Sequence, residues 1–328
     1  MEVDMRIVSS GEFGYQQSLQ WGQFPDEWTI EEIAGVAVDS QDRVYMLTRN
    51  RNGVIVFDQE GRHLMTWGED LFEIPHGLFI STDDSVYCVD HVAHTVHKLT
   101  TDGQLLMTMS NTDSPSAPNG SQHHSPEDPV WIAGPPFNLP TWLTVAPQGD
   151  MYVTDGYGNS QVHKYTPDGK LLLSWGEPGT GDGQFNVPHG ACVDADGKVY
   201  VADRQNCRIQ IFSPNGDYID EWDDANYPCD MCLDSNQNMY VAELGGFFMG
   251  DEKPDLTMPI PRVTVRNLQG EILAEWTDED ILGTGRYFAP HSIAIDSNGD
   301  LYLGQVSKSY TEGTAPADWN TLRKYIRA

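Results

Sequence analysis

One pattern of hydrophobic and polar positions recurs six times along the chain. Each copy begins with a short apolar run and a turn, continues into a second run that carries Tyr at a fixed place, and goes on to further runs. Short apolar runs separated by Gly, Asp and Asn turns predict β-strands. The first runs cover residues 35–39, 77–81, 142–146, 190–194, 230–234 and 292–296, and the tyrosines are Tyr45, Tyr87, Tyr152, Tyr200, Tyr240 and Tyr302. Third runs include 54–57, 96–99, 162–165 and 209–212, and fourth runs end at Trp67, Trp175, Trp222 and Trp276.

Six units of four short strands predict an all-β fold, a six-bladed β-propeller in which each unit forms one sheet. In the last unit no fourth run follows the third, at residues 322–326. The N-terminal stretch from Tyr15 to Trp21 and Gly22 resembles a spare fourth run, because two other fourth runs also end in Trp-Gly. We therefore expect this stretch to complete the last blade and to close the ring as a single domain over residues 1–328.

One segment interrupts the repeat. Residues 111–136 are rich in Ser, Pro, Asn and His, which predicts an inserted loop between the second and third blades. His123 and His124 lie in this loop, where a solvated pair is the more usual arrangement than a metal site.

The charge of the chain narrows its range of partners. Its 328 residues include 19 Lys and Arg against 49 Asp and Glu, a formal net charge of −30. With 39 % hydrophobic residues and nine Trp, the sequence is not that of a disordered acidic chain. A charge of this sign repels phosphate backbones and anionic membrane surfaces, so we expect no nucleic-acid partner and no membrane partner.

Two features of the sequence bear on the cellular compartment in which the protein is expected. The first residues lack the basic and apolar segments of a signal peptide. The five cysteines are scattered, and Cys229-x-x-Cys232 has no second pair with which to form a zinc site. We expect reduced thiols and a cytoplasmic protein.

Histidine occupies one repeat position in every second unit. In a ring of six blades these units stand 120° apart, and equivalent positions point toward a common axis, so three imidazoles are expected to converge. Three neutral imidazoles with an open position form a catalytic type of zinc site, and another divalent metal could take their place. The alternative is that they are strand-capping turn residues. His91, His94 and His97 have no symmetric mates and are assigned to the surface or rim. The residues just before the first runs are Ala34, His76, Thr141, His189, Cys229 and His291.

The ends of the second runs carry a second set of candidates. Arg49, Tyr157 and Arg204 stand there in the first, third and fourth units. An Arg beside a metal can grip a carboxylate with two hydrogen bonds, and a Tyr beside a cation can act as a base. The alternatives are an aromatic plug at Tyr157 and an ion pair between Arg204 and Asp203.

Three stretches resemble the lyase domain of peptidylglycine α-amidating enzymes, a six-bladed propeller of the NHL-repeat class that is also called peptidyl-α-hydroxyglycine α-amidating lyase. The similarity covers about residues 35–300. It is carried by Pro75-His76-Gly77-Leu78, by Asp155-Gly156-Tyr157-Gly158-Asn159-Ser160 and by Val201-Ala202-Asp203-Arg204-Gln205-Asn206.

The resemblance implies roles for particular residues. His76, His189 and His291 match the zinc ligands, Tyr157 matches the catalytic tyrosine, and Arg49 and Arg204 match arginines of the active site, where they would bind the substrate carboxylate. The family's calcium is held partly by main-chain carbonyls that fall on Val36 and Leu78, but its acidic ligand falls on Ser292, which puts calcium in doubt. A methionine near the metal falls on Ala289, and one partner of a disulfide falls on Gly158.

The resemblance also implies a reaction. The chain is expected to be a zinc-dependent lyase that cleaves the C–N bond of a carbinolamide, peptide or small molecule, to an amide and glyoxylate or a related aldehyde. Two alternatives stay open: a metal-dependent propeller hydrolase that acts on a lactone or ester, and a non-catalytic NHL scaffold that binds a protein partner. Loss of function on chelation would separate both enzymes from the scaffold.

Overall fold

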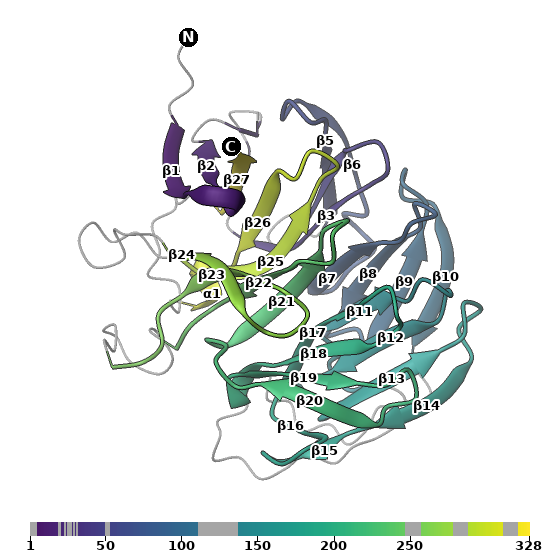
Figure 1. Ribbon diagram of the computed structural model, residues 1–328. Helices are drawn as coiled ribbons and strands as arrows, with labels where there is room; N and C mark the ends of the chain where they lie inside the picture. Colours follow the sequence, from purple (N-terminus) through teal and green to yellow (C-terminus); the bar gives the residue numbers. More distant parts are fainter. Residues whose placement is uncertain are drawn as a thin grey trace. The chain divides into compact units, whose positions relative to one another are not determined.

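The computed structural model describes residues 5–18, 21–22, 24, 28, 30, 32–49, 53–110, 137–246, 257–277, 288–310 and 321–328. Within these residues the chain forms the predicted all-β, six-bladed propeller (Figure 1). It divides into two compact units, Phe72–Pro228 and Met1–Leu71 with Cys229–Ala328, which are described separately below. The predicted loop 111–136, with His123 and His124, lies outside the described residues.

The unit Phe72–Pro228 contains three four-stranded antiparallel sheets, each of which is one blade. Their strands are β7 (Pro75–Ile80), β8 (Val86–Asp90), β9 (Thr95–Leu99) and β10 (Leu105–Ser110); β11 (Trp142–Val145), β12 (Met151–Asp155), β13 (Gln161–Tyr165) and β14 (Leu171–Trp175); and β17 (Pro188–Val193), β18 (Val199–Asp203), β19 (Arg208–Phe212) and β20 (Tyr218–Trp222). A short parallel pair, β15 (Glu177–Pro178) and β16 (Gln184–Phe185), and the 3-10 turn η2 (Arg204–Asn206) were not predicted.

The other unit contains two four-stranded sheets and one five-stranded sheet. The four-stranded sheets consist of β3 (Ile33–Val38), β4 (Val44–Thr48), β5 (Gly53–Phe57) and β6 (His63–Trp67), and of β21 (Pro228–Leu233), β22 (Met239–Glu243), β23 (Arg262–Arg266) and β24 (Ile272–Trp276). The third joins β25 (Pro290–Ile295), β26 (Leu301–Gln305) and β27 (Leu322–Arg327) to the N-terminal β2 (Tyr15–Ser18) and β1 (Met5–Ser9), with the turn η1 (Gly11–Phe13) between these two.

The predicted closure of the ring is confirmed. Strand β2 pairs antiparallel with β27, and Gln17 lies opposite Tyr325 (Figure 1). Strand β1 then extends this sheet to a fifth strand that the repeat pattern does not contain. The short helix α1 (Ser307–Tyr310) follows β26, and no helix in the described part of the chain is long and apolar enough to cross a bilayer.

The recurring Asp and Tyr have a shared structural cause. After β3, Oδ1 of Asp39 accepts the N–H groups of Gln41 and Arg43 and so closes the turn, while Oδ2 accepts the Tyr45 hydroxyl. Asp side chains bind nearby backbone in this way, which makes them strong turn formers. The pair recurs as Asp194 with Tyr200 and as Asp296 with Tyr302, so each turn is tied to the strand that follows it.

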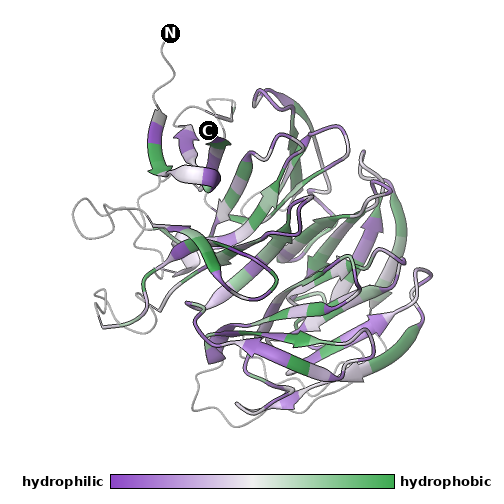
Figure 2. Cartoon of the chain, in the orientation of Figure 1, coloured by the Kyte–Doolittle hydropathy of each residue, from purple (hydrophilic) through white to green (hydrophobic). Residues whose placement is uncertain are grey.

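Apolar and polar side chains alternate along the strands, and this alternation explains which residues form the core. Apolar side chains from neighbouring strands form separate clusters in each unit, with fully buried rings such as Tyr152 and Phe212 in one unit and Tyr240 and Tyr325 in the other. Figure 2 shows hydrophobic and hydrophilic bands alternating along the arrows. The outer fourth strands keep some apolar residues in contact with solvent, as at Leu106, which is 53 % exposed.

Candidate metal centre

Each of the three repeat-position histidines stands at a β-bulge rather than before its strand. Pro75 pairs with Asp90 and Gly77 with Val89, so that His76 is the extra residue between them. The same shift in register occurs around His189 in β17 and His291 in β25. Bulges bend a strand and re-aim a side chain, and they are frequent beside active sites.

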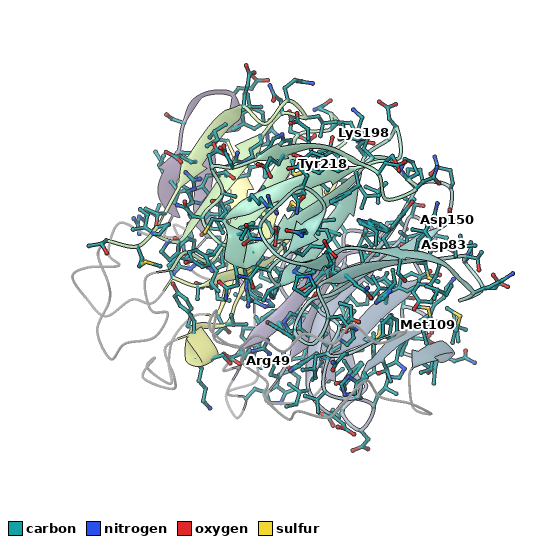
Figure 3. The ribbon with its side chains drawn as sticks, turned by 90° about the horizontal axis from the view of Figure 1, so that it is seen from below. Arg49, Asp83, Met109, Asp150, Lys198 and Tyr218 are labelled. Atoms are coloured by element: carbon teal, nitrogen blue, oxygen red, sulfur yellow. The ribbon has the colours of Figure 1, made fainter. Side chains whose placement is uncertain are left out.

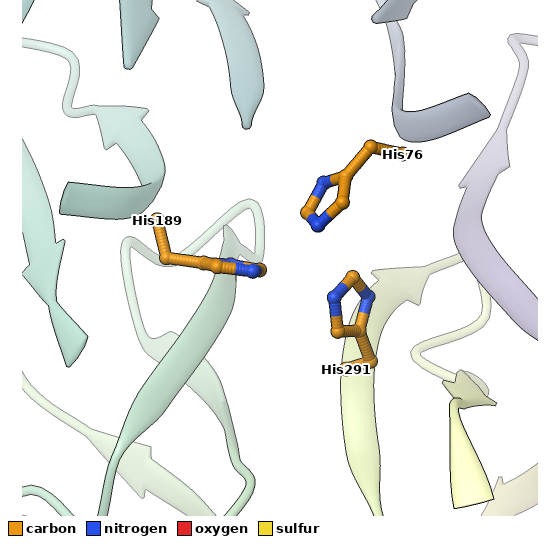
Figure 4. Close-up of side chains that lie close together, drawn as sticks. All are labelled: His76, His189 and His291. Carbon is orange, nitrogen blue, oxygen red and sulfur yellow. The ribbon is translucent and has the colours of Figure 1, made fainter. Parts of the chain in front are cut away.

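The three histidines form one buried group. Their exposed fractions are 0 % for His76, 0 % for His189 and 2 % for His291, and one ring nitrogen from each lies within 4.8 Å of the others (Figure 4). Such a group could hold a metal ion. The donor set suits zinc, which binds imidazole readily and in catalytic sites keeps one position for water or substrate.

Main-chain carbonyls orient two of the rings. Nδ1 of His76 lies 2.8 Å from the carbonyl oxygen of Thr141, and Nδ1 of His291 lies 2.8 Å from that of Ala34. Because a carbonyl can only accept, Nδ1 must carry a proton, and in the neutral imidazole this leaves Nε2 with its lone pair. This is the tautomer that a metal-binding histidine needs, and a carbonyl on the other nitrogen is a usual way to fix it.

Tyr157 lies directly against two of the histidines. Its hydroxyl oxygen is 2.9 Å from Nε2 of His76 and 3.2 Å from Nε2 of His189. The hydroxyl therefore stands beside Nε2 of both rings, and on His76 this is the atom whose lone pair could bind a metal. Gly156 makes this possible, because its Cα approaches Pro188 where a Cβ would overlap the Pro188 carbonyl. Tyr157 is half-buried, so part of its side chain is accessible to solvent.

Arg204 completes this part of the site. Its Nη1 donates to the Tyr157 hydroxyl at 3.3 Å, and its guanidinium lies 5.4 Å from the centre of the Tyr157 ring. The neighbouring Asp203 is ion-paired to Arg208, with Nε 2.8 Å from Oδ2. The structure thus brings His76, His189, Tyr157 and Arg204 together within one unit, four of the six residues singled out from the sequence.

Arg49 has other partners in its own unit. Its Nη1 lies 3.4 Å from Oε2 of Glu32 and 3.1 Å from the hydroxyl of Ser309, and Figure 3 shows Arg49 near the yellow helix α1 that carries Ser309. Glu32 also accepts the Ser309 hydroxyl and N–H. The role of Arg49 as a carboxylate-binding group stays a prediction.

The assignment of His91 and His97 to the surface or rim is wrong. Both are buried, at 8 % and 7 % exposed. The His91 ring lies 5.4 Å from the His76 ring and 5.7 Å from the Tyr157 ring, so it forms a wall of the site. His94 is half-buried, and its Nδ1 accepts the Leu139 N–H at 2.9 Å. His91 has no equivalent histidine in another blade, so the repeat gave no sign of its burial. His97, in contrast, is matched by the buried His163 at the same place in β13, so the repeat position could have indicated that it is buried.

Two threonines are further residues that sequence reasoning missed. Thr141 takes the position that holds histidine in the adjacent blades, and its hydroxyl donates to the Pro188 carbonyl at 2.9 Å. The hydroxyl of Thr154 donates to the His189 carbonyl at 2.7 Å. They tie the backbone of His189 to the blade that carries Tyr157. The only signal in the sequence was the place of Thr141 in the repeat.

The residues that would hold calcium do not fit that ion well. Ser292 offers a hydroxyl in place of a carboxylate, and this oxygen has no hydrogen-bond partner among the described residues. The carboxylate that reaches the same strand, Asp230, already accepts the N–H groups of Met231 and Ile293. Calcium prefers several carboxylate and carbonyl oxygens.

Two further positions carry residues other than those of the amidating lyases that the sequence resembles. Ala289 is buried, and its N–H donates to Oε1 of Gln305. Gly158 lies against Asn138, whose side-chain amide donates to the Gly158 carbonyl at 3.2 Å. A hydrogen bond thus stands where the resemblance places one end of a disulfide, and none of the five cysteines, all of which the structure describes, forms a disulfide.

Comparison with known proteins gives distant relatives. The NHL repeat family model matches residues 185–212. The chain is 27 % identical over 334 aligned residues to mouse peptidyl-glycine alpha-amidating monooxygenase. This alignment covers 90 % of this chain and 31 % of that protein. It is 32 % identical over 224 residues to human NHL repeat-containing protein 3, with 64 % of this chain and 60 % of that protein covered. Residues 185–212 thus resemble one NHL repeat within a six-bladed propeller. The chain spans about a third of the length of the monooxygenase.

A relative with a lyase name matches as well. Peptidyl-alpha-hydroxyglycine alpha-amidating lyase 1 of Drosophila melanogaster is 26 % identical over 267 residues, which covers 75 % of this chain and 45 % of that protein. Among solved structures, a streptogramin B lyase has a TM-score of 0.58 at 14 % identity, over 92 % of this chain and 95 % of that chain. At this identity the likeness supports the propeller fold and nothing finer.

Proposed function

We propose that this six-bladed propeller is a zinc-dependent lyase that cleaves the C–N bond of a carbinolamide acid to an amide and glyoxylate or a related aldehyde. The observation that carries the proposal is the position of the Tyr157 hydroxyl, 2.9 Å and 3.2 Å from the Nε2 atoms of His76 and His189. The distant relation to a lyase that acts on peptidyl-α-hydroxyglycine supports the same reaction class.

The residues suit the proton transfers of this reaction. Tyr157, in its phenolate form, takes the proton of the substrate hydroxyl as the carbon–oxygen bond becomes a carbonyl and the C–N bond breaks. The electron pair of that bond stays on the amide nitrogen, which then takes this proton from Tyr157, so the phenolate is restored and no water, oxidant or reductant is consumed. When bound by the histidines, zinc would polarise the substrate hydroxyl and ease its deprotonation.

Binding of the substrate carboxylate needs local positive charge, because the protein as a whole carries −30. Arg204 is the first candidate, since its Nη1 is 3.3 Å from the Tyr157 hydroxyl and thus within reach of a substrate at the phenol. A guanidinium can hold a carboxylate with two parallel hydrogen bonds. Arg49 would act as a second carboxylate-binding group if a substrate displaced it from Glu32.

The test is the release of glyoxylate from α-hydroxyhippurate and from ureidoglycolate. Wild-type protein is compared with Tyr157→Phe after treatment with a chelator and after zinc is restored. We expect release that requires zinc and falls by about 100-fold or more in Tyr157→Phe, in line with the loss of a general base. The matched control is Tyr218→Phe, which alters a partly exposed ring on the outer strand β20.

Each other outcome decides against the proposal. No release from zinc-loaded protein would exclude carbinolamides of these two types, and acid release from lactones or esters by the same protein would establish a hydrolase. Release that persists in Tyr157→Phe would remove Tyr157 from the role of base. Unchanged behaviour after chelation in every assay would favour the scaffold that binds a protein partner.

A further inference from the structure

Tyr157 is held by main-chain contacts from two sides. Its N–H donates to the Leu139 carbonyl at 3.3 Å, and the carbonyl of the next residue, Gly158, accepts the side-chain amide of Asn138 at 3.2 Å. These contacts come from the two-residue segment Asn138–Leu139, which precedes β11 and which we call the clamp. Because they flank Tyr157, they restrict both the position of its Cα and the direction of its side chain.

The clamp is itself anchored at its first residue. The N–H of Asn138 donates to both oxygens of Asp155, at 3.0 Å and 2.9 Å. Asp155 is fully buried at the end of β12, and it also accepts Asn159 and His163. The approach to β11 and the turn that carries Tyr157 are therefore joined at one buried carboxylate.

His94 fixes the other residue of the clamp. Its Nδ1 accepts the Leu139 N–H at 2.9 Å. Leu139 has a φ of 60°, in the left-handed region that leucine rarely occupies, and His94 has a φ of 54°, in a region where histidine is more common. Strained backbone of this kind persists where surrounding contacts hold it, and it is concentrated at functional sites. The His94 bond adds a side-chain contact to Leu139, whose carbonyl accepts the Tyr157 N–H.

Part of this arrangement belongs to the fold, and part is particular to Tyr157. In the next blade the Asn186 N–H donates to Asp203 and the Arg204 N–H donates to the carbonyl of Val187, whose φ is also 60°. The side-chain bonds of Asn138 and His94 are additions to this shared backbone pattern. They occur at the blade whose turn presents the phenol to His76 and His189.

We propose that Asn138 and His94 are positioning residues for Tyr157, and that they set the distance of its hydroxyl from the two histidine Nε2 atoms. The inference rests on the proposed function in that it takes Tyr157 as the base. Neither side chain is assigned a contact with the substrate. Removal of either should therefore lower kcat through Tyr157 and leave KM and metal binding nearly unchanged.

The decisive experiment is a double-mutant cycle. Asn138→Ala should lower kcat by about 10- to 100-fold, the effect expected when a reacting group is displaced by about 1 Å, with KM within about threefold of wild type. In the Tyr157→Phe background the same substitution should change the residual rate less than about twofold, because coupled residues are not additive. An equal loss in both backgrounds, or no loss in wild type, would overturn the proposal.

A second variant covers the case in which Asn138→Ala fails to fold. His94→Ala leaves every hydrogen bond of Asn138 in place and removes only the acceptor for the Leu139 N–H, and it should give the same pattern of rates. The matched control is Asn238→Ala, whose amide donates to Asp234 at 2.9 Å in a turn of the other unit. Its kcat should equal that of wild type.

A readout without turnover separates failure of this inference from failure of the proposed function. Hydrogen exchange of the Tyr157 amide should be at least about tenfold faster in Asn138→Ala and His94→Ala than in wild type and Asn238→Ala, because its hydrogen bond to Leu139 is released. If no carbinolamide is turned over and the exchange still quickens, the positioning holds and the substrate assignment fails. Unchanged exchange in both variants would overturn the positioning.

Discussion

Gly156 and Pro188 approach each other so closely that a Cβ on Gly156 would overlap the carbonyl oxygen of Pro188. This contact joins the turn before Tyr157 to the residue before His189. Since the obstacle is backbone, Gly156→Ala must displace the turn, and we expect a loss of activity of about 100-fold and of about 1–3 kcal/mol in stability. Steady-state kinetics and urea melts measure both. Gly181→Ala is the control, because its Cβ would meet only the side-chain amide group of Gln184 and no backbone. Equal effects in the two variants would contradict this interpretation.

The histidine group should bind one metal ion, and each histidine should matter. We expect His76→Ala to weaken the affinity for zinc by at least about 100-fold, because one of three protein ligands is lost. Competition with a chromophoric chelator measures the affinity. His63→Ala removes an exposed imidazole and should leave it unchanged. Equal affinities in His76→Ala and wild type would show that the ion is held elsewhere.

Arg204 should not be replaceable by lysine. Arg204→Lys retains the charge but loses the planar fork that binds a carboxylate at two points, so we expect kcat/KM for an acid substrate to fall by about 10- to 100-fold. An uncharged amide analogue of the substrate should be affected much less. Arg62→Lys, at an arginine side chain that is 65 % exposed, is the control. A similar loss for acid and amide would argue against a carboxylate contact.

Asp203 gives stability a defined dependence on pH. Burial raises the pKa of this carboxyl group from 3.8 to about 6, against the lowering effect of hydrogen bonds from Asn206, the Asn186 N–H and Arg208. The folded state therefore holds the proton more tightly than the unfolded chain. The contribution of Asp203 to the free energy of unfolding is complete below about pH 4 and is lost as the pH rises through about 6. The loss amounts to about 3 kcal/mol.

The variant Asp203→Asn isolates the pH-dependent stability that the carboxyl group contributes, because an amide does not titrate. Its free energy of unfolding should rise relative to that of wild type by about 3 kcal/mol between about pH 4 and pH 7. Urea melts of both proteins across this range provide the measurement. A difference that is constant, or that falls with increasing pH, would mean that the carboxyl group is ionised throughout.

The closure of the ring can be tested at Tyr15. This residue of β2 is fully buried, its hydroxyl donates to the Gly299 carbonyl at 3.0 Å, and its ring centre lies 5.3 Å from that of Trp276. Tyr15→Ala should cost about 3–5 kcal/mol, while Tyr15→Phe, which loses only the hydroxyl, should cost about 1 kcal/mol. Equilibrium unfolding compares them. A cost below about 1 kcal/mol for Tyr15→Ala would mean that β2 contributes little to closure.

The sequence by itself determined the blades, their number and the strand that closes the ring. These follow from local and periodic causes: alternation places side chains on two faces of a strand, and an Asp such as Asp39 closes its turn through groups two and four residues away. The alternate placing of His76, His189 and His291 was readable for the same reason, because repeat position fixes orientation within a blade.

Only the tertiary structure decided how the site is assembled. The bulges turn the histidines inward, and the contacts of Tyr157 with His76 and of His91 with Tyr157 join residues that are far apart along the chain and share no period. The pairing of Arg49 with Glu32 and the hydrogen bond from Asn138 to Gly158 arise in the same way. Such contacts depend on how particular loops pack against one another, which no pattern of hydrophobic and polar positions encodes.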